Sequence, residues 1–93
     1  MDFIKLIRIR KVKDKDGNVG YIHSGDVLIN KNNIVCVKEL CLQNENFIDD
    51  NGSKTLFENK KVAIITISIG NEREDIIVLQ NVEGVRIQLT AKI

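Results

Sequence analysis

Two runs of apolar, mostly β-branched residues, separated by a short polar stretch, form the strongest pattern in the chain. They lie within residues 61–79, which read KVAIITISIG, NERED and IIVL in that order. Such runs, bounded by turn-forming residues, are typical of two strands joined as a β-hairpin. The first run alternates little, which is typical of a strand covered on both faces. We therefore predict a buried hairpin, and its apolar density also predicts a subunit contact.

The first part of the chain predicts a second hairpin and a further strand. Residues 3–12 alternate in two apolar sets that become basic toward the end, and an Asp-Gly pair then favours a tight turn. Residues 19–23 would return as the second strand. Residues 24–26, Ser-Gly-Asp, predict another turn. After a short extended segment, an Asn-rich kink at residues 30–33 leads into a predicted strand at residues 34–42.

A polar insertion occupies residues 43–60 and is rich in turn formers. Asn51 and Gly52 lie near its centre, and an apolar pair lies on each side, at residues 47–48 and 56–57. This symmetry favours a hairpin extension with the Asn-Gly pair at its tip. The alternative is a long loop without regular structure, which is unusual in a small domain.

The tail, residues 80–93, fits two structures. From Val85 onward, apolar and polar residues alternate strictly, which favours a strand with one solvent-exposed face. The alternative is a helix capped by Asn81, because four apolar residues also have helical spacing: Val82, Val85, Leu89 and Ile93. Gly84 weakens the helix, and Ile87 would lie off its apolar side. The alternation leads us to expect the strand.

Size and composition support a single β-rich domain over residues 1–93. The 93 residues are 43% apolar, which allows one modest core, and three Phe, one Tyr and no Trp make that core aliphatic. The patterns together predict a mostly β fold, a small twisted antiparallel sheet closing into a barrel or sandwich, with one C-terminal helix as the open alternative. No apolar run reaches the ~18 residues that cross a bilayer, and no secretory signal is apparent. We expect no membrane contact and a cytoplasmic location.

The order of the aliphatic segments resembles one known family. The segments that carry the resemblance read IKLIR at residues 4–8, LIN and IVCVKE within residues 28–39, ITI at residues 65–67 and IVLQNVEGV at residues 77–85. This order is similar to that of the small flagellar FlbD-like bacterial proteins of unknown function. Their pattern is a strand ending in a basic residue, an apolar-Asn element before another strand, a hairpin and a closing V-x-E-V segment.

The chain departs from that family pattern in three places. These are the excursion at residues 14–25, the insertion at residues 43–60 and the alternating tail, where the family has a helix. The resemblance implies a small accessory or regulatory protein and brings no catalytic residues with it.

Residue types that serve catalysis or zinc binding are present, but without the required arrangement. His23, Ser24 and Asp26 are neighbours in sequence, whereas a catalytic triad needs a base oriented by a third group and an oxyanion hole. Cys36 and Cys41 with His23 lack a fourth ligand and the usual zinc-site spacing. We expect both cysteines to be reduced and mostly buried, on opposite faces of one strand.

A calcium-loop reading of the first turn also fails. Asp14, Asp16 and Asn18 resemble the start of such a loop. Val19 and Gly25, however, fall where the turn glycine and the closing glutamate would be needed. A hairpin turn explains these residues better. We therefore predict no catalytic residues, no metal and no cofactor.

Basic residues concentrate at the start of a chain whose formal net charge is only +1. On neighbouring strand ends they would neutralise phosphates in a salt-sensitive, sequence-blind way. The candidate nucleic-acid or anion-binding residues are Lys5, Arg8, Arg10, Lys11 and Lys13. The competing interpretation is a solvated rim, paired with nearby acids, that protects strand ends from aggregation.

Three functions are compatible with these observations, in the following order. The first is a non-enzymatic accessory or regulatory module acting through protein–protein contacts and self-assembly. The second is phosphate-directed nucleic-acid binding through the basic N-terminal hairpin. The third is an anionic small molecule or nucleotide bound between protomers. Because the aliphatic strands exceed what so short a chain covers, we expect a homo-oligomer.

Overall fold

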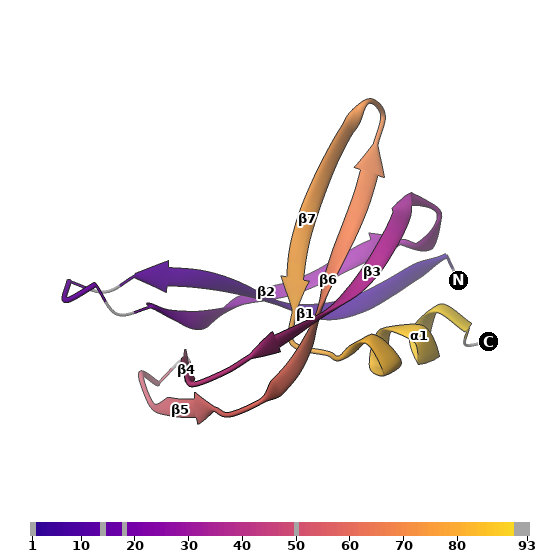
Figure 1. Ribbon diagram of the computed structural model, residues 1–93. Coiled ribbons are helices and arrows are strands. Elements are labelled where there is room, and N and C mark those ends of the chain that lie inside the picture. Colours follow the sequence, from indigo (N-terminus) through magenta and orange to yellow (C-terminus); the bar gives the residue numbers. More distant parts are fainter. Residues whose placement is uncertain (1, 14, 18, 50, 91–93) are drawn as a thin grey trace.

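The strands of this protein form one curled sheet, and a single helix follows at the C-terminal end (Figure 1). The computed structural model describes residues 2–13, 15–17, 19–49 and 51–90. The elements in chain order are β1 (Phe3–Lys13), β2 (Val19–Asn30), the 3-10 turn η1 (Lys31–Asn33), β3 (Ile34–Leu42), β4 (Glu45–Ile48), β5 (Lys54–Phe57), β6 (Lys60–Ile69), β7 (Glu72–Val78) and α1 (Val82–Thr90). The seven-stranded sheet has the order β3-β6-β7-β1-β2-β4-β5 and curls into a half-barrel. The predicted mostly β fold class is confirmed.

One long hairpin reaches both edges of this sheet. Its arms run from β3 into β4 and from β5 into β6, so β3 lies at one edge and β5 at the other. Each arm bends at an asparagine with left-handed backbone, Asn44 at φ 54° and Asn59 at φ 53°, a conformation that asparagine tolerates better than most residues. β4 pairs with β2 in parallel, whereas the other described pairs are antiparallel. The predicted hairpin extension within residues 43–60 is confirmed, with Gly52 at φ 81° in its turn.

Two hydrophobic cores lie on opposite faces of the sheet. The helix core contains the buried side chains Ile4, Leu6, Ile29, Ala63, Ile65, Ile76, Val78 and Val85. The hairpin core contains the buried side chains Ile9, Tyr21, Leu42 and Val62, with Phe47 and Phe57 packed against them. Successive side chains of a strand point to opposite faces, so neighbours in β6 such as Val62 and Ala63 serve different cores. The hairpin predicted at residues 61–79 is confirmed, and its half away from the turn is covered on both faces, whereas Ile69 and residues 70–75 at the turn are exposed.

The second strand is longer than predicted and contains a bulge in place of a turn. Ile7 pairs with Asp26, and Ile9 pairs with His23, so β2 carries one extra residue between these pairs. Gly25 lies there with φ 92°, the backbone conformation that such bulges often require. The turn predicted at residues 24–26 is therefore wrong, because the chain continues in the same direction through the bulge.

The tail forms a helix, and the expected strand is wrong. Val85 is fully buried in the helix core, and Val82 and Leu89 pack against it with the spacing of one helix face. Ile87 is 57% exposed, because it lies off the apolar side of the helix, as the helix alternative predicted. The helix core needs a cover over a sheet face, and a further strand would pair only along a sheet edge. Residues 91–93 of the predicted strand lie outside the described residues.

Candidate interaction site

The five predicted basic residues do not form one surface. Side chains alternate along β1, so Lys5, Lys11 and Lys13 point to the face of the hairpin core, and Arg8 and Arg10 point to the face of the helix core. The Lys5 Nζ atom lies 3.4 Å from an Asp26 carboxylate oxygen, and an Arg8 guanidinium nitrogen lies 3.3 Å from a Glu74 oxygen. Both pairs are largely exposed, so each adds little stability, but each reduces the charge available to a phosphate.

The remaining three basic residues lie on the outer part of the β1–β2 hairpin. Arg10 pairs with Ile22 across the hairpin, Lys11 with Tyr21, and Lys13 with Val19. Arg10, Lys11 and Lys13 are all exposed, and none of them forms an ion pair with a residue that the structure describes. Figure 1 shows the turn end of this hairpin projecting beyond the other strands of the sheet. It forms a cationic arm with charges on both sides.

The residues that suggested a triad lie around the β2 bulge. The His23 Nε2 atom is 3.8 Å from Asp26 Oδ1, and the same carboxylate also pairs with Lys5. The Asp26 carboxylate is therefore shared between two basic groups at the surface and is not dedicated to orienting His23. Among the described residues, no three His, Cys, Asp or Glu side chains cluster closely enough to hold a metal ion. Asp14 and Asn18 of the calcium-loop interpretation lie outside those residues.

The two cysteines lie in β3, as predicted, and are unpaired thiols. Their odd separation places them on opposite faces of the strand. Cys41 is exposed and Cys36 is partly exposed, so the expectation that both are mostly buried is wrong. β3 lies at the edge of the sheet and has a neighbouring strand, β6, on one side only. Its side chains are therefore less covered than those of an inner strand.

A buried polar contact inside the hairpin core was not anticipated from the sequence. Tyr21 is only 4% exposed, and burial, together with the charge and hydrogen bonding of Glu45, raises its pKa above the usual 10.0. The second carboxylate oxygen of Glu45 is buried without a hydrogen-bond partner among the described residues. The parallel pairing of β2 with β4 brings these two side chains together, so no local sequence signal could have shown it.

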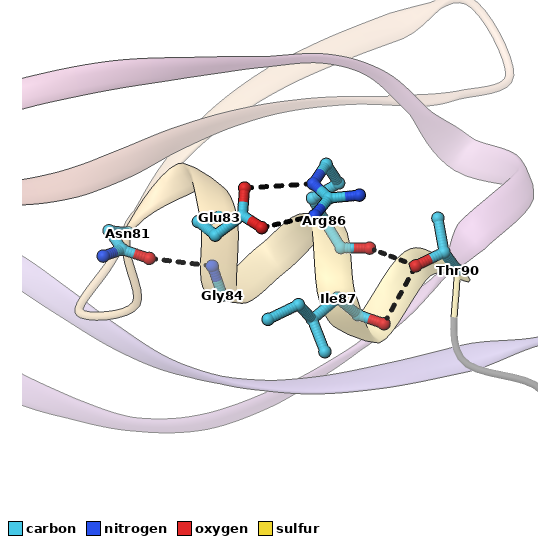
Figure 2. A network of polar contacts seen from close by, with 6 residues as sticks. All are labelled: Asn81, Glu83, Gly84, Arg86, Ile87 and Thr90. Carbon is cyan, nitrogen blue, oxygen red and sulfur yellow. Dashed lines mark hydrogen bonds and ion pairs between the residues drawn. The ribbon is translucent and has the colours of Figure 1, made fainter.

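The polar network at α1 consists of contacts within the helix and its cap, which stabilise the helix (Figure 2). The Asn81 side-chain oxygen accepts a hydrogen bond from the Gly84 backbone nitrogen at 2.7 Å, which caps the first turn. Arg86 binds the Glu83 carboxylate and holds the pKa of Glu83 below its usual value. The Thr90 hydroxyl donates to the Arg86 carbonyl at 3.0 Å. Each of these contacts lies on the exposed side of the helix.

Exposed apolar side chains gather beside an open strand edge. Leu28 is 70% exposed and Phe3 is 53% exposed. Lys5 lies opposite Leu28 and Asn30 lies opposite Phe3, so the two apolar side chains are diagonal neighbours on one face of the β1–β2 hairpin. β4 pairs with β2 only at residues 20–22. Among the described residues, residues 26–30 of β2 therefore pair on one side only, with β1.

The other exposed large apolar side chains of the described residues are spread along the chain: Val19, Val35, Leu56, Ile69 and Ile87. In the part of the chain that the structure describes, no helix has the length and apolar character to cross a bilayer. No protein-family model matches the chain, and no curated protein or solved structure matches it either.

Proposed function

We propose that this chain is a small non-enzymatic accessory module that acts through protein contacts, including contacts between copies of itself. The observation that carries the proposal is the open edge of β2 with Phe3 and Leu28 exposed beside it. Proteins usually protect such an edge with charge, proline or a covering segment, because its free backbone groups accept another strand. Exposed apolar side chains at the same place favour association instead. The resemblance to the FlbD-like proteins, which implies a small accessory or regulatory protein, favours the same function.

Self-association is tested by measuring molar mass behind a sizing column. One chain has a mass of 10.5 kDa, and at tens of micromolar we expect a larger species. Leu28→Lys should return the protein to one chain, because it places a charge beside the open edge. Leu56→Lys is the matched control, since Leu56 is also an exposed strand leucine, at 52%, but lies in β5. A wild-type protein that runs as a clean monomer under these conditions overturns the proposal.

The cationic arm of β1 and β2 supports a second candidate function, phosphate-directed nucleic-acid binding. Its support is the set of exposed basic residues Arg10, Lys11 and Lys13, which form no ion pair with any described residue. Each phosphate contact changes the slope of log affinity against log salt concentration by about 0.9 on duplex DNA. We expect Arg10→Ala/Lys11→Ala to reduce that slope by roughly 2. Lys5→Ala is the control, since Lys5 is already paired with Asp26. Binding that is absent, or insensitive to salt, rejects this function.

A further inference from the structure

We infer that the open edge of β2 pairs with the same edge of a second copy of the chain, in an antiparallel arrangement with a two-fold axis at Leu28. This inference rests on the proposed function and specifies its partner and its register. The pairing would join the two half-barrels into one continuous sheet running from β3 of one copy through both β2 strands to β3 of the other.

The edge is open and regular where the pairing requires it. Residues 26–30, with the sequence DVLIN, lie beyond the bulge and pair residue by residue with β1. They contain no proline and no lysine, the residues that commonly block strand addition. Leu28 at their centre is the most exposed of the large hydrophobic side chains in the described residues. A second strand would cover it.

The register follows from the faces of the strand. A two-fold axis perpendicular to the sheet keeps each side chain on its own face, so a residue must lie opposite one that shares its face. Centred on Leu28, the pairing places Leu28 opposite Leu28, Val27 opposite Ile29, and Asp26 opposite Asn30. The carboxylate of Asp26 then meets an amide, and no like charges face each other directly.

Both faces of the resulting sheet are chemically matched. On the face of the helix core, β1 already places Ile4 beside Ile29 and Leu6 beside Val27, so the new pair of Val27 and Ile29 extends an apolar row across four strands. On the other face, the two leucines lie between the Lys5 side chains of the two copies. The aliphatic stem of a lysine covers such a surface while its ammonium stays in water.

Alternative pairings fit less well. A slip of two residues in either direction places Leu28 opposite Asp26 or Asn30, which puts an apolar side chain against a polar one. The outer edge of β3 is also open, but pairing centred on Lys38 or Glu39 places like charges opposite each other. β3 also has an irregularity between Ile34 and Cys36 that disturbs its edge. The edge of β5 is only four residues long.

Cysteine cross-linking tests the register directly. Because Cys41 is exposed, the background protein carries Cys36→Ser and Cys41→Ser. Directly opposed residues in antiparallel strands have Cα atoms about 4.5–5.5 Å apart, which is within the range that disulfides bridge. Leu28→Cys should form a covalent dimer with itself on mild oxidation. Asp26→Cys and Asn30→Cys should each remain monomeric alone and should cross-link when mixed.

Val35→Cys is the matched control, because Val35 is 50% exposed and lies on the open edge of β3. We expect Leu28→Cys to give roughly ten-fold more covalent dimer than Val35→Cys. If the wild-type protein associates but only Val35→Cys cross-links, the β2 pairing is overturned and the proposed function stands. If Asp26→Cys cross-links with itself, the register is wrong. If the wild-type protein is monomeric, both the pairing and the proposed function fail.

Discussion

Two buried leucines test whether the cores on opposite faces of the sheet fold as one unit. Leu6 in the helix core is 0% exposed, and Leu42 in the hairpin core is 1% exposed. The two cores share the backbone of β6, since Val62 and Ala63 are adjacent and serve different cores. A cavity on either face is therefore expected to destabilise the whole sheet.

The expected magnitudes follow from how each site can relax. A buried Leu→Ala substitution costs about 2–5 kcal/mol, and less where neighbouring groups move into the cavity. Leu6 belongs to the core that the nine-residue helix α1 covers, and a helix held mainly by side-chain packing can shift toward the cavity. We expect Leu6→Ala to cost about 2–3 kcal/mol and Leu42→Ala, among paired strands, about 3–4 kcal/mol. A domain of 93 residues has a total stability of roughly 5–14 kcal/mol, so both variants should fold.

Urea unfolding provides the measurement. Circular dichroism follows the whole sheet, and fluorescence of Tyr21, the only tyrosine, follows the hairpin core. With an m-value of about 1–3 kcal/mol/M, each substitution should lower the unfolding midpoint by roughly 1–2 M. Leu56→Ala, at an exposed leucine, is the control and should change the free energy of unfolding by less than about 0.5 kcal/mol.

Either of two results would refute the reasoning. A loss below about 1 kcal/mol for Leu6→Ala or Leu42→Ala would mean that the site is not packed as the structure shows. A Leu6→Ala protein in which Tyr21 fluorescence and circular dichroism give different midpoints would mean that the two cores unfold separately.

Two further predictions concern single side chains. Titration of the Tyr21 phenol, followed by tyrosinate absorbance, should give a midpoint above 10.0 in the folded protein and a lower one in denaturant. Because the folded protein holds this proton more tightly, the stability it contributes is present below the unfolded pKa and is lost as pH rises through the folded pKa; equal midpoints would exclude the burial of Tyr21 beside Glu45. Asn81→Ala should lower stability by about 1 kcal/mol in thermal unfolding, because the Gly84 nitrogen loses its cap. Asn81→Asp keeps a capping oxygen, so its stability should stay close to that of the wild type. An equal loss of stability in both variants would show that the cap is unimportant.

Local patterns were sufficient to find most strands. The runs within residues 61–79 became β6 and β7, and the apolar pairs around Asn51 and Gly52 became the β4–β5 extension. These predictions succeeded because a turn residue and the alternation beside it act over a few neighbouring positions. The predicted turn at residues 24–26 failed because a glycine with positive φ serves a bulge as well as a turn, and only the partner strand distinguishes the two.

The candidate site was less accessible from the sequence. The cluster of basic residues in β1 suggested one surface, but a strand divides its side chains between two faces, and Asp26 and Glu74 pair with two of the five. Nothing in the sequence singled out Leu28 as an exposed residue. Its exposure depends on β4 pairing with β2 only at residues 20–22, which depends in turn on where the long hairpin bends.

The sequence by itself determined a small, aliphatic, mostly β domain and the positions of its hairpins, because strand periodicity and turn chemistry are local. Only the tertiary structure decided that the tail is a helix, that Tyr21 meets Glu45 and that the edge of β2 stays open. The tail had two valid periodicities, and the choice between them came from a sheet face that Val85 covers. The physical reason is the same in each case: burial and pairing depend on residues far apart in the chain.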